Sequence, residues 1–141
     1  MIAGDTAAVE RSVEIAKQVG AKRAIILPVS VPSHCDLMSP AAEKFVKYLQ
    51  NVNWSNQSIP VIQNYDVASH NDKDAICNAL VKQLYSPVRW IETVEFFVAE
   101  NVTKIIECGP GKVLTGLNKR IAKDVELMSL SDALSVESVV C

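Results

Sequence analysis

Short apolar runs alternate along this chain with longer segments whose apolar residues recur at helical spacing. Four runs have the length and composition of buried strands: residues 23–27, 59–63, 104–108 and 126–130. Strands that are separated by helical segments favour βαβ units and a mainly parallel sheet. The sequence therefore predicts an α/β fold.

Capping and breaking residues mark the predicted helices. Asp5 or Thr6 can cap the start of a helix over residues 7–19. Gly20 is placed to end that helix. Pro40 stands at the first position of a second helix, where its missing N–H costs nothing. Further helices are predicted over four later segments: 74–84, 86–98, 113–121 and 132–140.

Charge and composition limit the classes of partner. The 14 basic and 16 acidic residues are scattered along the chain without a polybasic run, so neither nucleic acid nor a membrane surface is an expected partner. No apolar stretch approaches the roughly 18–20 residues that a transmembrane helix needs. The N-terminus has no features of a secretory signal, and the four cysteines form no C-x-x-C pair. We therefore expect a cytoplasmic protein with reduced thiols.

The apolar share of the chain is high for a small protein. Hydrophobic residues make up 49% of it, and its mean hydropathy is +0.16. A sheet covered by helices on both faces would account for this, and so would a fragment whose apolar face contacts sequence outside these 141 residues. Composition leaves both alternatives open.

One histidine has a position that suggests catalysis. His34 follows the apolar run 23–27 and the strand-ending Pro32, so we expect it on a rigid loop at a sheet edge. It is a candidate general base, although a lone histidine is commonly structural. Neighbours in an extended segment point to opposite faces, so Ser33 and Cys35 are poor partners for its ring. A thiol enzyme that uses Cys35 remains a weaker alternative.

Other polar positions give weaker signals. Gln83 lies on the apolar face of its predicted helix, where it either bonds nearby backbone or helps to orient His34. The Gly109-Pro110-Gly111-Lys112 segment favours a tight turn over a phosphate cradle, because Pro110 removes a backbone donor. His70 is expected to be a solvated loop residue. No cluster has the spacing of metal ligands.

Five segments together resemble the malonyl-CoA:acyl carrier protein transacylase family. They are VSVPSHC at 29–35, DAI at 74–76, QLY at 83–85, PVRW at 87–90 and ECGPGKVLTGL at 107–117. The resemblance runs from about Ile2 to the C-terminus and covers the C-terminal half of the family. It implies that residues 1–30 are a remnant of a ferredoxin-like subdomain. Residues 31–141 would then be the closing part of an α/β-hydrolase-like parallel sheet with helices.

The resemblance also implies an activity, the transfer of malonyl from malonyl-CoA to acyl carrier protein in fatty acid biosynthesis. His34 matches the histidine that takes the proton of a catalytic serine and returns it to the CoA thiol. Gln83 matches the position whose backbone carbonyl accepts a hydrogen bond from that histidine, and Asn64 lies near the family's site. No cofactor or metal is implied, since phosphopantetheine is carried by the acyl carrier protein.

The family's serine elbow, its malonyl-binding arginine and its Gly-Gln-Gly segment all lie upstream of residue 1. We therefore expect the isolated chain to be inactive, and to require an N-terminal half or to self-associate. The alternative is a non-catalytic fragment that binds acyl carrier protein or the parent enzyme.

Overall fold

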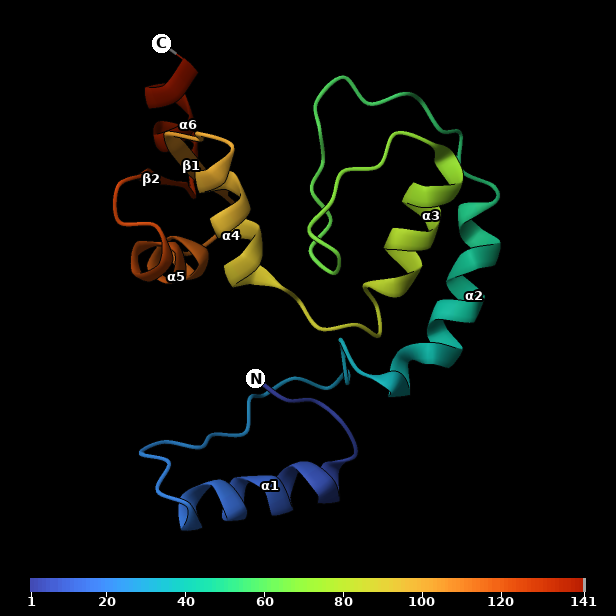
Figure 1. Ribbon diagram of the computed structural model, residues 1–141, viewed down its shortest axis with the longest axis vertical. Coiled ribbons are helices and arrows are strands. Elements are labelled where there is room, and N and C mark those ends of the chain that lie inside the picture. The colour runs from blue at the N-terminus through green and yellow to red at the C-terminus, as the bar shows by residue number, and fades with distance from the viewer. Residues whose placement is uncertain (141) are drawn as a thin grey trace. The chain divides into compact units, whose positions relative to one another are not determined.

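The computed structural model of the chain describes residues 1–140 and divides into two compact units (Figure 1). Unit 1 covers Met1–Val88, and unit 2 begins at Arg89. The domain boundary expected near residue 30 stays a prediction. Cys141, one of the expected free thiols, lies outside the described residues.

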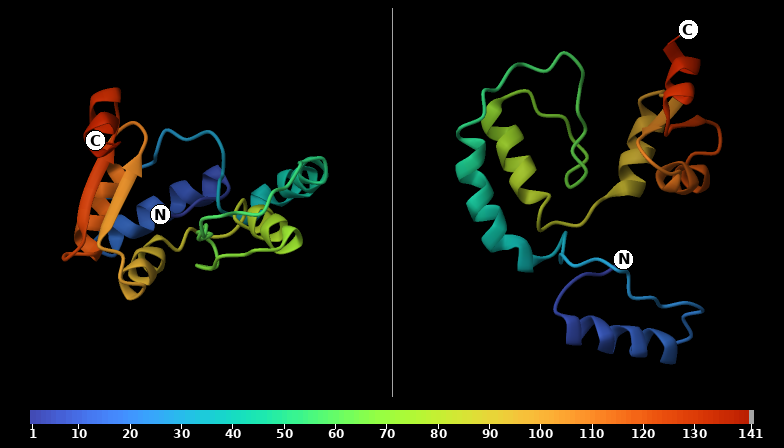
Figure 2. Two further views of the ribbon diagram at one scale, coloured as in Figure 1. Left: turned by 90° about the horizontal axis from the view of Figure 1, so that it is seen from above. Right: turned by 180° about the vertical axis from the view of Figure 1, so that it is seen from behind.

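Unit 1 is built from helices and long connections. Its elements are α1 (Thr6–Gln18), the 3-10 turn η1 (Asp36–Met38), α2 (Ser39–Leu49) and α3 (Lys73–Lys82). Helices α2 and α3 pack side by side (Figures 1 and 2). Ala42, Leu49 and Ala79 are their buried apolar side chains. Burial of these residues joins the two helices into one layer.

Helix α1 begins and ends where its capping residues predict. The Asp5 carboxylate accepts hydrogen bonds from the N–H groups of Ala7 and Ala8, at 3.0 and 3.3 Å. Gly20 follows the helix with a φ of 92°, a left-handed conformation that glycine adopts without steric cost. No residue of α1 is fully buried, so its apolar face is only partly covered.

The predicted strand at residues 23–27 does not form. The segment is extended without a hydrogen-bonded partner strand, and the side chains of Ile25, Ile26 and Leu27 remain more than half exposed. An apolar run becomes a strand only where a neighbour pairs with its backbone N–H and C=O groups. Residues 1–88 supply no such neighbour to this run.

The predicted strand at residues 59–63 is also wrong. Ile62 makes one antiparallel bridge to Ser69, which closes a tight turn. Within the turn, the Gln63 N–H donates to the Ala68 carbonyl at 2.9 Å, and the Val67 N–H donates to the Gln63 carbonyl at 3.0 Å. Turn pairing therefore uses the backbone groups that a parallel ladder would need.

Unit 2 contains the parallel pairing that the sequence predicts. Strands β1 (Lys104–Cys108) and β2 (Glu126–Leu130) have the predicted bounds and pair in parallel from Lys104–Glu126 to Cys108–Leu130 (Figure 2). Helix α5 (Val113–Ile121) connects them as a βαβ crossover. Helices α4 (Trp90–Ala99) and α6 (Ala133–Val140) precede and follow this βαβ segment in the sequence, and both belong to unit 2.

The core of unit 2 has an apolar and a polar component. Val94 of α4 is fully buried, and Asn118 of α5 is 1% exposed. The Trp90 indole N–H donates to the Asn118 side-chain oxygen at 2.9 Å, which satisfies a buried acceptor. This bond ties α4 to α5. None of the helices in the described part of the chain combines the length and apolarity that a membrane crossing requires.

Candidate functional site

The backbone of His34 is held by the end of α3. Its N–H donates to the Leu84 carbonyl at 2.9 Å, and its φ of 65° is left-handed. Leu84 lies in the turn that follows α3, so its carbonyl has no partner within the helix and is available to a neighbouring loop. His34 thus lies at a helix end. The expectation that a sheet edge would hold it is wrong, because the strand at residues 23–27 does not form.

The His34 ring faces two further carbonyls from the same turn. Nδ1 lies 2.8 Å from the Gln83 carbonyl oxygen and 3.2 Å from the Ser86 carbonyl oxygen. A carbonyl only accepts, so Nδ1 must carry the proton in both contacts. In the neutral ring, Nε2 is then the nitrogen with a free lone pair.

Gln83 contacts His34 through its backbone rather than through its amide side chain. The helix was expected to reach Leu84, but α3 ends at Lys82 and Gln83 is its C-cap residue. The Gln83 carbonyl therefore lies at the negative end of the helix dipole. The structure brings His34 and Gln83 together, while the catalytic role of each stays a prediction.

The residues beside His34 make other contacts. The Cys35 thiol donates to the Pro32 carbonyl at 3.1 Å. Within residues 1–88, no described hydroxyl or thiol forms a hydrogen bond with His34 Nε2. This geometry gives no support to the hypothesis of a thiol enzyme that uses Cys35.

His34 lines a hollow of about 810 Å³ in unit 1. The other walls come from α1 and from the extended segment that precedes the His34 loop. Leu27, Val29 and Val31 of this segment are 52%, 66% and 49% exposed. The hollow is therefore open and largely apolar on one side.

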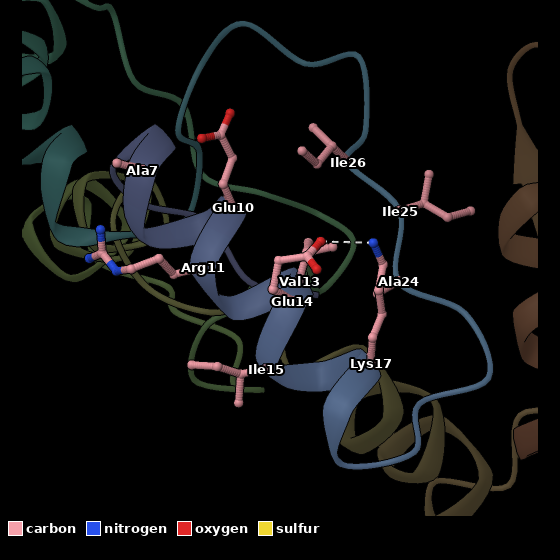
Figure 3. Close-up of a pocket in the computed structure, with 10 residues that line it drawn as sticks. All are labelled: Ala7, Glu10, Arg11, Val13, Glu14, Ile15, Lys17, Ala24, Ile25 and Ile26. Carbon is pink, nitrogen blue, oxygen red and sulfur yellow. Dashed lines mark hydrogen bonds and ion pairs between the residues drawn. The ribbon is translucent and has the colours of Figure 1, made fainter.

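A second hollow of about 840 Å³ lies between α1 and residues 24–26 (Figure 3). Ile25 and Ile26 stand across it from the helix, and Glu14 and Lys17 form an exposed ion pair at 2.8 Å. Exposed pairs of this kind contribute little to stability. Apolar surface is thus left uncovered along residues 24–26 in this hollow and along residues 24–31 in the hollow that His34 lines.

Asn64 lies in the turn closed by Ile62 and Ser69. Its side-chain oxygen is buried without a hydrogen-bond partner among the described residues. Among the described residues, its side chain forms no hydrogen bond with His34 or Gln83. The role of Asn64 in the site stays a prediction.

His70 is not the solvated residue expected from its polar loop. Its Nε2 lies 2.8 Å from an Asp66 carboxylate oxygen, and its side chain is 24% exposed. Burial, and then the Asp66 carboxylate, raise the pKa of the neighbouring Tyr65 hydroxyl. The Lys82 ammonium lies 5.7 Å from the Tyr65 ring centre. The i, i+4 spacing of Asp66 and His70 was the only sequence signal of this cluster.

The start of α5 is occupied by a carboxylate of the protein itself. Glu107 accepts hydrogen bonds from the Leu114 N–H at 3.1 Å and from the Thr115 N–H at 2.7 Å. The Thr115 hydroxyl donates to the same carboxylate, and this bond is the main cause of the lowered pKa of Glu107. A bound phosphate would use these same donors. The segment at residues 109–112 was predicted to be a tight turn rather than a phosphate cradle. The positive φ values of Gly109 and Gly111 agree with that prediction.

Residues 1–140 contain no group of three or more His, Cys, Asp or Glu side chains arranged to hold a metal ion. The arrangement at His34 is instead that of an oriented imidazole, with Nδ1 bound to backbone and Nε2 making no hydrogen bond to the part of the chain that the structure describes. Such a ring can accept and return a proton. The site and the βαβ unit therefore define a class, an α/β protein with an oriented histidine that can exchange a proton.

Comparison with known proteins narrows this class, although no protein-family model matches the chain. The chain is 50% identical over 139 residues to the malonyl CoA-acyl carrier protein transacylase of Haemophilus influenzae, and 48% identical over 132 residues to that of Escherichia coli. The first match covers 99% of this chain and 45% of that relative. The chain thus spans less than half the length of the curated relatives it matches.

Solved structures give the same result. An acyl carrier protein S-malonyltransferase from Vibrio cholerae aligns with a TM-score of 0.89 at 52% identity, covering 96% of this chain and 44% of its own. A malonyl-transacylase solved with a type II PKS acyl-carrier protein aligns with a TM-score of 0.91 at 47% identity, with the same coverage of both chains. The resemblance to the C-terminal half of the malonyl-CoA:acyl carrier protein transacylases is therefore confirmed.

Proposed function

We propose that this chain supplies the general base for malonyl transfer from malonyl-CoA to acyl carrier protein. The observation that carries the proposal is the 2.8 Å contact between His34 Nδ1 and the Gln83 carbonyl oxygen. This contact assigns the proton to Nδ1 and leaves Nε2 as the basic nitrogen. The resemblance to transacylases assigns the nucleophile to a serine outside residues 1–141.

In the proposed reaction, Nε2 of His34 takes the serine proton while the serine oxygen attacks the malonyl thioester carbonyl. The new C–O bond forms, the C–S bond to CoA breaks, and the imidazolium returns the proton to the CoA thiolate. The phosphopantetheine thiol of the carrier then attacks the acyl-enzyme, so that a new C–S bond forms and the ester C–O bond to the serine oxygen breaks. The ring takes the proton of this thiol and returns it to serine.

The end of α3 offers the charged ring an alternative to a triad carboxylate. The imidazolium formed during transfer carries a positive charge close to the Gln83 carbonyl at the C-terminus of the helix. Cations are stabilised at this end by the helix dipole, typically by about 0.3–1 kcal/mol at exposed sites and by up to about 2 kcal/mol where partly buried. His34 is partly buried, so the helix end supports its proposed role.

The proposed partners are acyl carrier protein and the remaining part of a transacylase. The relative solved with an acyl-carrier protein supports the first of these. The open apolar segment at residues 24–31 supports the second, because its large apolar side chains stay about half exposed or more and its backbone pairs with no strand in unit 1. The complete assembly would cover this segment and bring a serine to His34.

A chimera tests the catalytic proposal. This chain would replace the matching C-terminal part of the Haemophilus influenzae transacylase, to which it is 50% identical. We expect the chimera to transfer malonyl to acyl carrier protein and His34→Ala to lower kcat by about 10³-fold, within the usual range for loss of a general base. Cys35→Ala serves as the matched control and should retain activity. Full transfer by the His34→Ala chimera would rule out the proposed base.

The alternative is a non-catalytic fragment that binds acyl carrier protein, and the exposed apolar side chains of unit 1 favour it. Titration of the isolated chain with carrier protein distinguishes the two. Binding without transfer, by both the chain and the chimera, would support this alternative. Absence of binding at millimolar carrier would exclude it.

A further inference from the structure

A second acceptor lies close to the His34 ring. The Ser86 carbonyl oxygen is 3.2 Å from Nδ1, beside the Gln83 carbonyl at 2.8 Å. The Leu84 carbonyl lies between these two in sequence and accepts from the backbone N–H of His34. The turn after α3 therefore presents three backbone carbonyls to His34. The carbonyl of Ser86 is the last of the three in sequence.

The residue after Ser86 is a proline, which restricts the backbone of the residue that carries this carbonyl. Pro87 disfavours the helical region for the residue before it and favours an extended backbone, with ψ of about +120 to +160°. A helical ψ of about −20 to −70° would turn the Ser86 carbonyl through roughly half a revolution, away from the ring. The Pro87 side chain is exposed, so its influence acts through the backbone rather than through packing.

We propose that Pro87 is a positioning residue for His34. By keeping Ser86 extended, it holds the Ser86 carbonyl against Nδ1, and the Nδ1–H is shared between two acceptors. Nε2 then stays unprotonated in the neutral ring. The catalytic meaning of this arrangement rests on the proposed function, but the arrangement itself can be measured without any reaction.

The measurement is the tautomer of the neutral His34 ring, obtained from the ¹⁵N shifts of its two nitrogens by solid-state NMR, which an associated chain does not prevent. The chain is labelled with ¹⁵N-histidine, and His70→Gln identifies the signals of the only other histidine. We expect the Nδ1–H form in the native chain. Pro87→Ala should lower the ratio of Nδ1–H to Nε2–H by about threefold, as expected for one weak neutral hydrogen bond.

Matched variants separate backbone from side chain. Gln83→Ala and Ser86→Ala keep both carbonyls and should leave the tautomer ratio unchanged. A double variant, Ser86→Val with Pro87→Ala, should restore the native ratio, because a β-branched residue favours an extended backbone. A native chain with the Nε2–H form, or a Pro87→Ala chain with the native ratio, would overturn the proposal.

Pro87→Ala could also disrupt the whole turn, and fast hydrogen exchange at the His34 N–H would reveal this, since that group bonds to Leu84. In that case the Ser86→Val, Pro87→Ala double variant is decisive. A native tautomer ratio in this variant would support the proposal, and a lowered ratio would overturn it. The transfer assay of the His34→Ala chimera is independent. A chimera that does not need His34 would refute the proposed function and leave the tautomer result standing.

Discussion

At the scale of single residues, Glu107 shows how one carboxylate determines a local structure. It caps α5 from the end of β1, and the Thr115 hydroxyl and backbone N–H are the main causes of its lowered pKa. The carboxylate binds these donors only in the folded chain. Its stabilising effect is therefore complete above its ordinary pKa near 4.5 and is lost as the pH falls through the lower folded value.

We predict that Glu107→Gln lowers the Tm at neutral pH by several degrees, because glutamine keeps one acceptor oxygen and loses the charge. The difference from the native chain should shrink as the pH falls below about 4.5. Thermal unfolding followed by circular dichroism between pH 7 and pH 3 measures this. Glu43→Gln, an exposed position within α2, is the control. A difference that stays constant with pH would contradict the assignment.

The backbone of His34 supports a second prediction at this scale. A φ of 65° costs a non-glycine residue about 1–2 kcal/mol relative to glycine. His34→Gly should therefore be more stable to urea than His34→Ala by about 1 kcal/mol, although both lose the ring contacts. Equal stability of the two variants would show that the loop is not left-handed in solution.

At the scale of elements, α3 is the support of the candidate site. The Asp72 carboxylate caps its start by accepting from the Ala75 N–H at 2.9 Å. We predict that Asp72→Ala costs about 1 kcal/mol of unfolding free energy, measured by urea denaturation, whereas Asp72→Asn keeps most of the stability because asparagine caps equally well. Similar losses in both variants would indicate that charge rather than capping matters.

Local signals predicted most elements, and the two wrong strands failed through backbone pairing that the local sequence does not report. Strands β1 and β2 have the predicted bounds because a short crossover supplies each with its partner. The run at residues 23–27 is also short and apolar, but no partner strand for it exists within residues 1–88. Strand formation depends on a neighbour that composition does not report.

In the candidate site, too, local sequence signals could not predict contacts between residues that are far apart in the chain. His34 and Gln83 are 49 positions apart, so spacing alone could not join them, and their pairing came from the resemblance to a family. Asn64 was carried over in the same way, and its place in the site stays a prediction, since its buried side-chain oxygen has no hydrogen-bond partner among the described residues. The Glu107 cap was missed because its donors follow seven and eight residues later, beyond the reach of the usual capping pattern.

At the scale of the whole molecule, the uncovered segment at residues 24–31 determines solution behaviour. Unpaired extended backbone with exposed apolar side chains favours association between copies. We predict that the isolated chain is oligomeric or poorly soluble, and that Ile26→Lys lowers its apparent mass in light scattering. Gln18→Lys adds the same charge at an exposed position of α1 and should have little effect. A monomeric native chain would contradict this prediction.

The use of peptide carbonyls at the His34 ring has an evolutionary consequence. A carboxylate partner can be lost through a single codon change, whereas every amino acid brings its own backbone oxygen. Genetic drift at positions 83 and 86 can therefore alter side chains without removing either acceptor. Purifying selection on the arrangement should fall instead on the proline codon that follows.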